Sequence, residues 1–196
     1  MPRPKIEDAE GRLLASGLSL FARDGTERVN TNSIARRAGV GVGTFYAYFD
    51  DKYALLREVQ IRTLGGIRAE RTAALQGVGA DAAAQVRATV SAVVTFAERH
   101  PEAYRVTFAR ERPGTAAHGP VMSESIRPTA QGLERLQRRG VLPEALDVEL
   151  AARAYHSMEV GTLLWWIENP RRAPKAQLVE TLSLLHPALA ARASAA

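Results

Sequence analysis

The stretch from Thr31 to Lys52 constrains the fold of this chain more than any other part of its 196 residues. It reads TNSIARRAGVGVGTFYAYFDDK, a pattern that predicts two short helices joined by a glycine turn. Thr31 can cap the first helix, because its side-chain oxygen accepts from N–H groups that the first turn leaves unpaired. Gly39 stands where that helix has to stop, since glycine adopts a left-handed backbone at little cost.

The second predicted helix follows the turn at residues 39–41. Its apolar and aromatic side chains return at three- and four-residue spacing, at Val42, Phe45, Tyr46 and Phe49. The two phenylalanines share one face, which we expect to pack against Leu20 and Phe21. Two helices with so tight a turn form a helix-turn-helix, and in DNA-binding proteins the second helix of this motif lies in the major groove.

Tyr46 and Tyr48 lie off that packed face. A tyrosine in such a position can offer its hydroxyl to a phosphate or a base edge, although a half-buried surface tyrosine fits the pattern too. Lys52 opens the next helix, where an ammonium can bind a phosphate or simply remain solvated. The neighbouring Asp50 and Asp51 suit a helix start but repel DNA, so Lys52 has to outweigh them locally.

The same stretch resembles the N-terminal DNA-binding domain of the TetR (tetracycline-repressor) family of bacterial transcription regulators. The matching residues include Leu13, Leu14, Leu20, Phe21, Gly25, Thr31, Ile34, Ala35, Ala38, Gly39, Val40, Gly43, Thr44, Phe45, Tyr46, Tyr48, Phe49, Lys52 and Leu55. The resemblance is specific over residues 10 to 58, and beyond them only the length and the helical pattern match. Gly41 replaces a serine that is usual in the family, and Val42 replaces a residue that is often polar or charged.

The resemblance implies an all-α fold, in which an N-terminal three-helix helix-turn-helix domain precedes a helical ligand-binding and dimerisation domain. We place these domains at residues 1–52 and 53–196. It also implies a homodimer that binds double-stranded operator DNA. The residues assigned to DNA are Thr31 for phosphate, then Asn32, Val42, Gly43 and Thr44 for bases and close backbone approach, with Tyr46, Tyr48 and Lys52.

The charge pattern is compatible with this assignment. The net charge is +5, and Arg28, Arg36 and Arg37 lie in a stretch without acids, which gives a modest basic footprint for phosphates. Arginines on an outer helix face are also often simply solvated. The glycine-rich turn does not form a nucleotide-binding loop, because the G-x-G-x-x-G pattern needs glycine where Thr44 and Tyr46 stand.

After Lys52 the chain keeps helical periodicity without the alternation typical of strands. We expect helices at residues 53–75, 81–97, 100–108, 121–139 with Pro128 inside it, 147–168 and 174–191, with a loop over 112–120. Together with the N-terminal helices this gives about nine helices.

The last two long helices are the expected dimer surface. In the first, one stripe consists of Ala151, Ala154, Met158, Gly161 and Trp165, beside a second one of Ala152, Tyr155, Glu159, Thr162 and Trp166. The final helix adds a seam of Leu178, Leu182, Leu185 and Leu189. The resemblance implies that this pair forms a four-helix bundle between two subunits, while an intramolecular core is the alternative.

A ligand pocket for a small-molecule effector is expected between the middle helices. The predicted lining residues are Tyr104, Phe108, Met122, Ile126, Tyr155, Glu159 and Trp166, although such residues at helical spacing often form only core. An acid inside an apolar stripe needs a partner, which for Glu159 is Arg153, His156, another subunit or a polar ligand group.

Other classes of function find little support. The chain has no cysteine, and His156 with Glu159 supplies too few ligands for a metal site. No nucleophile and base stand at a telling spacing, so we expect no catalytic residue, metal or cofactor. The charged start lacks a signal-peptide pattern and no apolar run is long enough to span a membrane, so we expect a cytoplasmic protein.

These observations predict a transcriptional regulator, in the simplest form a repressor that binds a palindromic operator as a homodimer and is released by a small, mostly apolar ligand. The alternative is a helical small-molecule-binding or scaffold protein that has lost DNA function. A third possibility is an α-helical enzyme.

Overall fold

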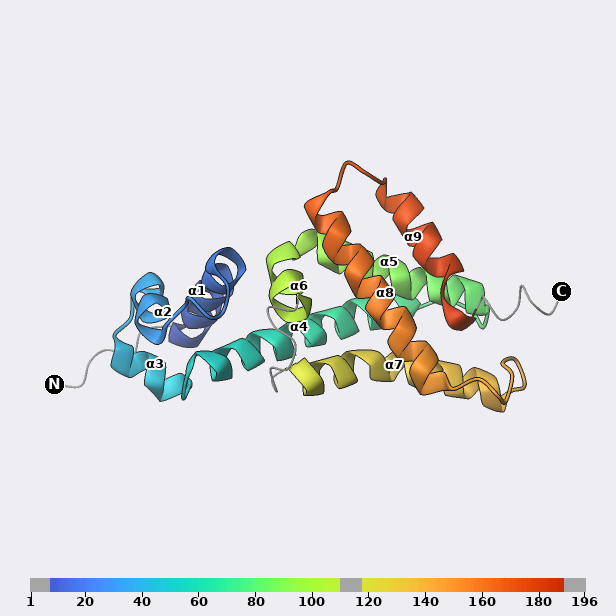
Figure 1. Ribbon diagram of the computed structural model, residues 1–196, viewed down its shortest axis with the longest axis horizontal. Helices are drawn as coiled ribbons and strands as arrows, with labels where there is room; N and C mark the ends of the chain where they lie inside the picture. The colour runs from blue at the N-terminus through green and yellow to red at the C-terminus, as the bar shows by residue number, and fades with distance from the viewer. Residues whose placement is uncertain (1–7, 110–117, 189–196) are drawn as a thin grey trace. The chain divides into compact units, whose positions relative to one another are not determined.

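The computed structural model describes residues 8–109 and 118–188, and within these ranges all regular structure is helical (Figure 1). The described helices are α1 (Ala9–Asp24), α2 (Thr31–Ala38), α3 (Val42–Tyr48), α4 (Lys52–Leu75), α5 (Ala82–Arg99), α6 (Pro101–Phe108), α7 (His118–Arg138), α8 (Val148–Glu168) and α9 (Lys175–Leu184). The all-α fold predicted from the sequence is confirmed.

The helices form two compact units. One holds the described residues up to Thr63 together with the segment that starts at Glu102, and the other holds Leu64–Pro101 and the described residues from His118 onward. Helix α4 therefore contributes its first half to one unit and its second half to the other. The domain boundary predicted after residue 52 coincides with the end of the helix-turn-helix. The packed N-terminal unit extends further along α4, to Thr63, so this boundary stays a prediction.

The core of the N-terminal unit is built from the apolar faces of α1 to α4. Leu13, Ile34, Phe45 and Leu55 are fully buried in one cluster, one from each helix. Gly17 allows a close approach there, because a Cβ at this position would collide with the side chain of Leu55. The helix-turn-helix thus rests on a continuous apolar base formed by α1 and α4.

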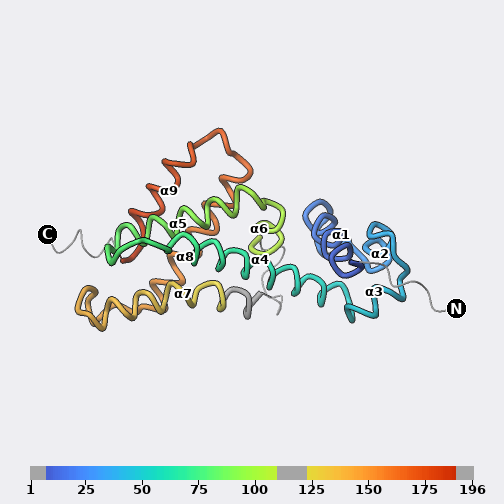
Figure 2. Tube along the Cα trace, turned by 180° about the vertical axis from the view of Figure 1, so that it is seen from behind, coloured from blue at the N-terminus to red at the C-terminus, as the bar shows by residue number. Residues whose placement is uncertain are grey.

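In the C-terminal unit, α7 packs on α8 and α5 packs on α9. Helices α8 and α9 run in opposite directions, as the two views in Figures 1 and 2 show. Asp81 and Asp147 cap α5 and α8 by accepting from backbone N–H groups of the first turn. Among the described helices, none is both long and apolar enough to cross a membrane.

Two predicted boundaries were wrong. The last helix was expected to reach residue 191, but α9 ends at Leu184. Pro187 explains this end, because proline has no N–H for the helical ladder and restricts the residue before it. The loop expected over 112–120 also ends earlier, because α7 already begins at His118, while the rest of that loop lies outside the described residues.

Candidate DNA-binding and ligand-binding sites

Helix α2 begins with a capping box centred on Asn30. The Asn30 side chain accepts from the backbone N–H of Ser33 at 2.9 Å, and the Ser33 hydroxyl accepts from the backbone N–H of Asn30 at 3.3 Å. The prediction that Thr31 is the N-cap was therefore wrong. Asn30 has the extended backbone that a cap requires, and Thr31 is the first residue of the helix itself.

The turn between α2 and α3 depends on glycine, as predicted. Gly39 has φ 66° and ψ 34°, the left-handed conformation that ends a helix, and the N–H of Val40 donates to the carbonyl of Ala35 at 3.0 Å. Gly41 then caps α3 through its backbone alone, because it has no side chain that could accept a hydrogen bond.

Helix α3 has two chemically different faces. Phe45 and Phe49 are buried in the core of the N-terminal unit, which confirms their predicted role. The opposite face is exposed to 38% at Val42, 55% at Tyr46 and 42% at Tyr48. Gly43 is exposed as well, and a Cβ added there would meet no atom within 4 Å. This face of α3 is thus largely accessible to solvent.

Two hydroxyl groups from different helices meet at the edge of this face. The Thr31 Oγ1 atom of α2 lies 3.3 Å from the Tyr46 Oη atom of α3. Each residue was predicted to contact DNA, but the sequence did not indicate that they contact each other. Because a hydroxyl can both donate and accept, the pair can offer an O–H donor to a single phosphate oxygen.

Lys52 has a structural role that sequence reasoning missed. Its ammonium donates to the backbone carbonyls of Thr26 at 2.8 Å, Val29 at 3.0 Å and Glu27 at 3.2 Å. These three bonds use all the N–H donors of a lysine. The ammonium therefore ties the loop between α1 and α2 to the start of α4, and a phosphate contact would have to replace one of these bonds. Backbone acceptors carry no side-chain signature, so no motif could have revealed them.

The remaining polar residues near the helix-turn-helix are exposed. Asn32 lies in the first turn of α2, and Arg28 and Arg36 extend into solvent. Arg37 donates to the Ser19 hydroxyl of α1 at 2.9 Å. Asn32, Arg28 and Arg36 thus remain accessible to solvent.

The predicted ligand-binding residues are divided between the two units. Tyr104 and Phe108 belong to the N-terminal unit, where both are buried and their ring centroids lie 4.7 Å apart. The C-terminal unit holds Ile126, Tyr155, Glu159 and Trp166, all of them buried. The side chain of Met122 lies outside the described part of the structure.

Glu159 is the centre of a buried polar cluster. Its carboxylate lies 3.5 Å from Arg71 of α4 and 3.9 Å from the Nδ1 atom of His156. The Nε2 atom of His156 lies 2.9 Å from the Ser125 hydroxyl of α7. Arg153, considered from the sequence as a partner, pairs with Glu149 instead at 3.6 Å. Arg71 was not predicted, because its partner lies far away in the sequence.

Burial controls the charges of this cluster. It raises the pKa of Glu159, and Arg71 opposes that rise by favouring the carboxylate. Burial, together with the positive charges of Arg71 and Arg153, lowers the pKa of His156 to about 4. His156 is therefore neutral at pH 7, and the cluster consists of one arginine, one carboxyl group and neutral hydrogen-bonding groups.

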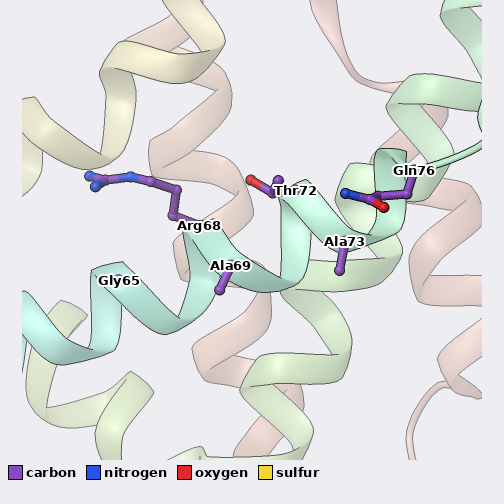
Figure 3. Close-up of a pocket in the computed structure, with 6 residues that line it drawn as sticks. All are labelled: Gly65, Arg68, Ala69, Thr72, Ala73 and Gln76. Carbon is purple, nitrogen blue, oxygen red and sulfur yellow. The ribbon is translucent and has the colours of Figure 1, made fainter.

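A separate groove runs along the outer face of α4 in the C-terminal unit (Figure 3). It is lined by Gly65, Arg68, Ala69, Thr72, Ala73 and Gln76. Gly65, Arg68, Ala69, Thr72 and Ala73 come from α4, and Gln76 directly follows its end; because all of them are exposed, the groove is a feature of the surface. It includes none of the residues predicted to bind a ligand.

A comparison with known protein families agrees with this architecture. Residues 13–59 match the family model described as bacterial regulatory proteins, tetR family. The matched segment contains α2, α3 and most of α1. Over these residues the chain matches the N-terminal helix-turn-helix segment of tetR-family regulatory proteins.

Individual relatives are more distant. The nucleoid occlusion factor SlmA of Actinobacillus pleuropneumoniae serotype 5b is 27% identical over 111 residues, which cover 54% of this chain and 52% of that protein. The chain thus spans about half the length of the curated relatives it matches.

Solved structures share the whole fold. The regulator FadR from Bacillus subtilis, solved in complex with stearoyl-CoA, has a TM-score of 0.76 at 19% identity and covers 91% of this chain and 98% of its own. A putative transcriptional regulator from Pseudomonas aeruginosa PAO1 has a TM-score of 0.79 at 22% identity. The match covers 97% of this chain and 96% of that one. At such identities the likeness shows the common fold.

Proposed function

We propose that this protein is a repressor that binds a palindromic operator as a homodimer and is released by a small, mostly apolar ligand. The observation that carries the proposal is the exposed face of α3. It displays Tyr46 and Tyr48 outward, although nothing in the core requires them, while the opposite face anchors the helix through Phe45. A recognition helix presented in this way fits the major groove.

The proposed contacts divide into two kinds. The hydroxyls of Thr31 and Tyr46, with the exposed Asn32 and Arg36, supply contacts to phosphates and fix the position of the protein on the duplex. The residues Val42, Gly43 and Thr44 reach toward the bases, and Tyr48 contacts the DNA from farther round α3. Lys52 contributes by holding the loop before α2, and any phosphate contact of its own is secondary.

The homodimer is proposed to form through the outer faces of α8 and α9. Large apolar side chains are exposed there, at Leu150, Trp165, Leu184 and Leu185. Gly161 lies on the same face of α8 with open space around its missing Cβ, which permits close helix packing. Leu178 and Leu182, predicted from the sequence as part of the seam, are buried within the subunit. A second copy would cover the exposed side chains and place two helix-turn-helix units on one operator.

The effector is proposed to bind in the C-terminal unit near the buried cluster. Ile126 and Trp166 offer apolar lining, and Glu159 with Arg71 offers a polar anchor. The FadR relative that shares this fold was solved with stearoyl-CoA, which supports an acyl-type ligand. Helix α4 carries both Lys52, which holds the α1–α2 loop, and Arg71, which contacts Glu159, so it is the proposed link between ligand and DNA.

Release requires that the ligand bind the DNA-free arrangement more tightly than the DNA-bound one. By linkage, operator DNA must then weaken ligand binding by the same factor.

The test uses the purified full-length chain and the duplex upstream of its own gene, at fixed salt. We expect a salt-sensitive complex with one protein dimer per site, and an acyl compound found by thermal shift should weaken it. If no duplex binds more tightly than random DNA, the repressor proposal gives way to the scaffold alternative.

A further inference from the structure

The composition of α3 restricts what the recognition helix can read. Direct readout of guanine uses arginine or lysine, adenine uses asparagine or glutamine, and cytosine uses a carboxylate. The seven residues from Val42 to Tyr48 contain none of these types. The helix therefore lacks the side chains that make bidentate hydrogen bonds with purines.

Its exposed groups are methyl groups and hydroxyls instead. Val42, Gly43, Tyr46 and Ala47 are all exposed, and their spacing places them on one side of the helix. Gly43 has open space where a side chain would stand, so this side of α3 can approach a base pair closely. The groups nearest to such a base pair are then the branched side chain of Val42 and the methyl group of Ala47.

In the major groove, the base feature that matches an aliphatic group is the C5-methyl of thymine. We infer that α3 reads its operator mainly through thymine methyl groups, with Val42 and Ala47 as the specificity-determining residues. This inference rests on the proposed docking of α3 in the major groove. It predicts half-sites whose centre is rich in A·T pairs and poor in guanine contacts.

The helix α2 offers a competing amide at Asn32. Asn32 is exposed in the first turn of α2, but the first helix of a helix-turn-helix crosses the DNA backbone. Its amide therefore lies closer to phosphates than to base edges. A base contact by Asn32 would give a preference for adenine that does not depend on any methyl group.

The test removes the methyl groups from the DNA and leaves base pairing intact. Full-length protein first selects its preferred site from a random duplex pool. Each thymine of that site is then replaced singly by deoxyuridine, and the affinity is measured by fluorescence anisotropy at one salt concentration. We expect at least one thymine in each half-site at which this replacement weakens binding roughly fourfold, the value for one buried methyl-sized group.

Protein variants assign the contact. Val42→Ala should bind the parent site more weakly and lose its sensitivity to deoxyuridine at one position. Ile61→Ala, which truncates an exposed apolar residue of α4, should keep the full sensitivity. If replacing the sensitive thymine by cytosine weakens binding, then 5-methylcytosine at the same position should bind more tightly than cytosine, because it restores the methyl group.

The outcomes separate this inference from the function on which it rests. Tight binding to a selected site without any deoxyuridine effect, or with guanine at its centre, would overturn methyl readout and leave the repressor proposal intact. A protein that selects no sequence and shows no salt-dependent binding would overturn both.

Discussion

Helices α3 and α8 each place one face in a core and one outside, but they place their polar groups differently. The inner face of α3 is apolar, with Phe45 and Phe49, while its outer face carries the tyrosine hydroxyls. The inner face of α8 buries His156 and Glu159, while its outer face exposes Leu150 and Trp165. Exposure alone therefore does not define which partner a surface binds. The hydroxyl groups of α3 suit a hydrated, charged partner, whereas the apolar side chains of α8 suit an apolar one.

The buried acid of α8 gives the largest expected effect. Arg71→Met should lower the free energy of unfolding by about 3 kcal/mol, because it leaves the Glu159 carboxylate buried without its cation. Glu159→Gln in the same chain should recover most of that loss. Urea unfolding at one protein concentration measures both, and an equal loss in both variants would show that the pair contributes nothing.

The same variant has a pH signature. Burial raises the pKa of Glu159, and the loss of Arg71 should raise it further. When folding raises the pKa of a carboxyl group, the protein loses stability as the pH rises above the group's ordinary pKa. The deficit of Arg71→Met relative to the parent should therefore be larger at pH 8 than at pH 5.

The outer face of α8 comes next. Trp165→Glu combined with Leu184→Glu should give monomers in sedimentation and reduce operator affinity on the order of 100-fold, because two linked heads bind far better than one. Ile61→Glu is the matched control, since it places a charge on another exposed apolar residue and should leave the dimer intact. An unaltered dimer would move the interface away from α8 and α9.

Lys52 should contribute more to the stability of the protein than to its binding of phosphate. Lys52→Met keeps the aliphatic stem but removes three hydrogen bonds to carbonyls, which we expect to cost about 2 kcal/mol in unfolding. The control is Lys175→Met, which breaks only an exposed ion pair with Glu98 and should cost below about 0.5 kcal/mol. If Lys52 instead binds phosphate, its loss should reduce the slope of log affinity for DNA against log salt concentration by about one.

The hydroxyl pair of α2 and α3 should have a smaller effect. Tyr46→Phe and Thr31→Val should each weaken operator binding about fivefold, near 1 kcal/mol, with unchanged melting temperature. Because both hydroxyls are proposed to serve one phosphate, the double variant should lose less than the sum. Tyr53→Phe removes another exposed hydroxyl and should bind like the parent; additive losses would place the two hydroxyls on separate phosphates.

The smallest effect concerns the two glycines of the turn. Gly41→Ser should stabilise the protein by a few tenths of a kcal/mol, because Gly41 has φ −71° and a serine there can cap α3. Gly39→Ser should instead destabilise it by about 1 kcal/mol, because its φ is 66° and its Cβ would meet the Arg12 guanidinium. Thermal unfolding compares the pair, and a loss of stability in Gly41→Ser would contradict the capping argument.

Much of the fold was predictable because it depends on local patterns. Gly39 as a helix stop and the burial of Phe45 and Phe49 both follow from spacing and backbone preference. The cap of α2 was misplaced by one residue because Asn30 and Thr31 are both capping types, and only the backbone distinguishes them.

The rest depends on tertiary contacts without a local signal. The carbonyl acceptors of Lys52 belong to a loop of no particular sequence, and Arg71 meets Glu159 only once α4 and α8 have packed. The pairing of Thr31 with Tyr46 is of the same kind. Sequence thus predicted which residues are exposed on α3, but not how the neighbouring polar groups are used.

The open space beside Gly43 has an evolutionary consequence. Apart from its own helix backbone and chain neighbours, no described residue comes within 4 Å of a Cβ added there, so substitutions at this position do not disturb the core. Val42 and Ala47 are exposed on the same helix and are comparably tolerant. If α3 reads DNA as proposed, a copy that arises by gene duplication can change its DNA specificity by a few substitutions in α3 while it keeps its folding stability.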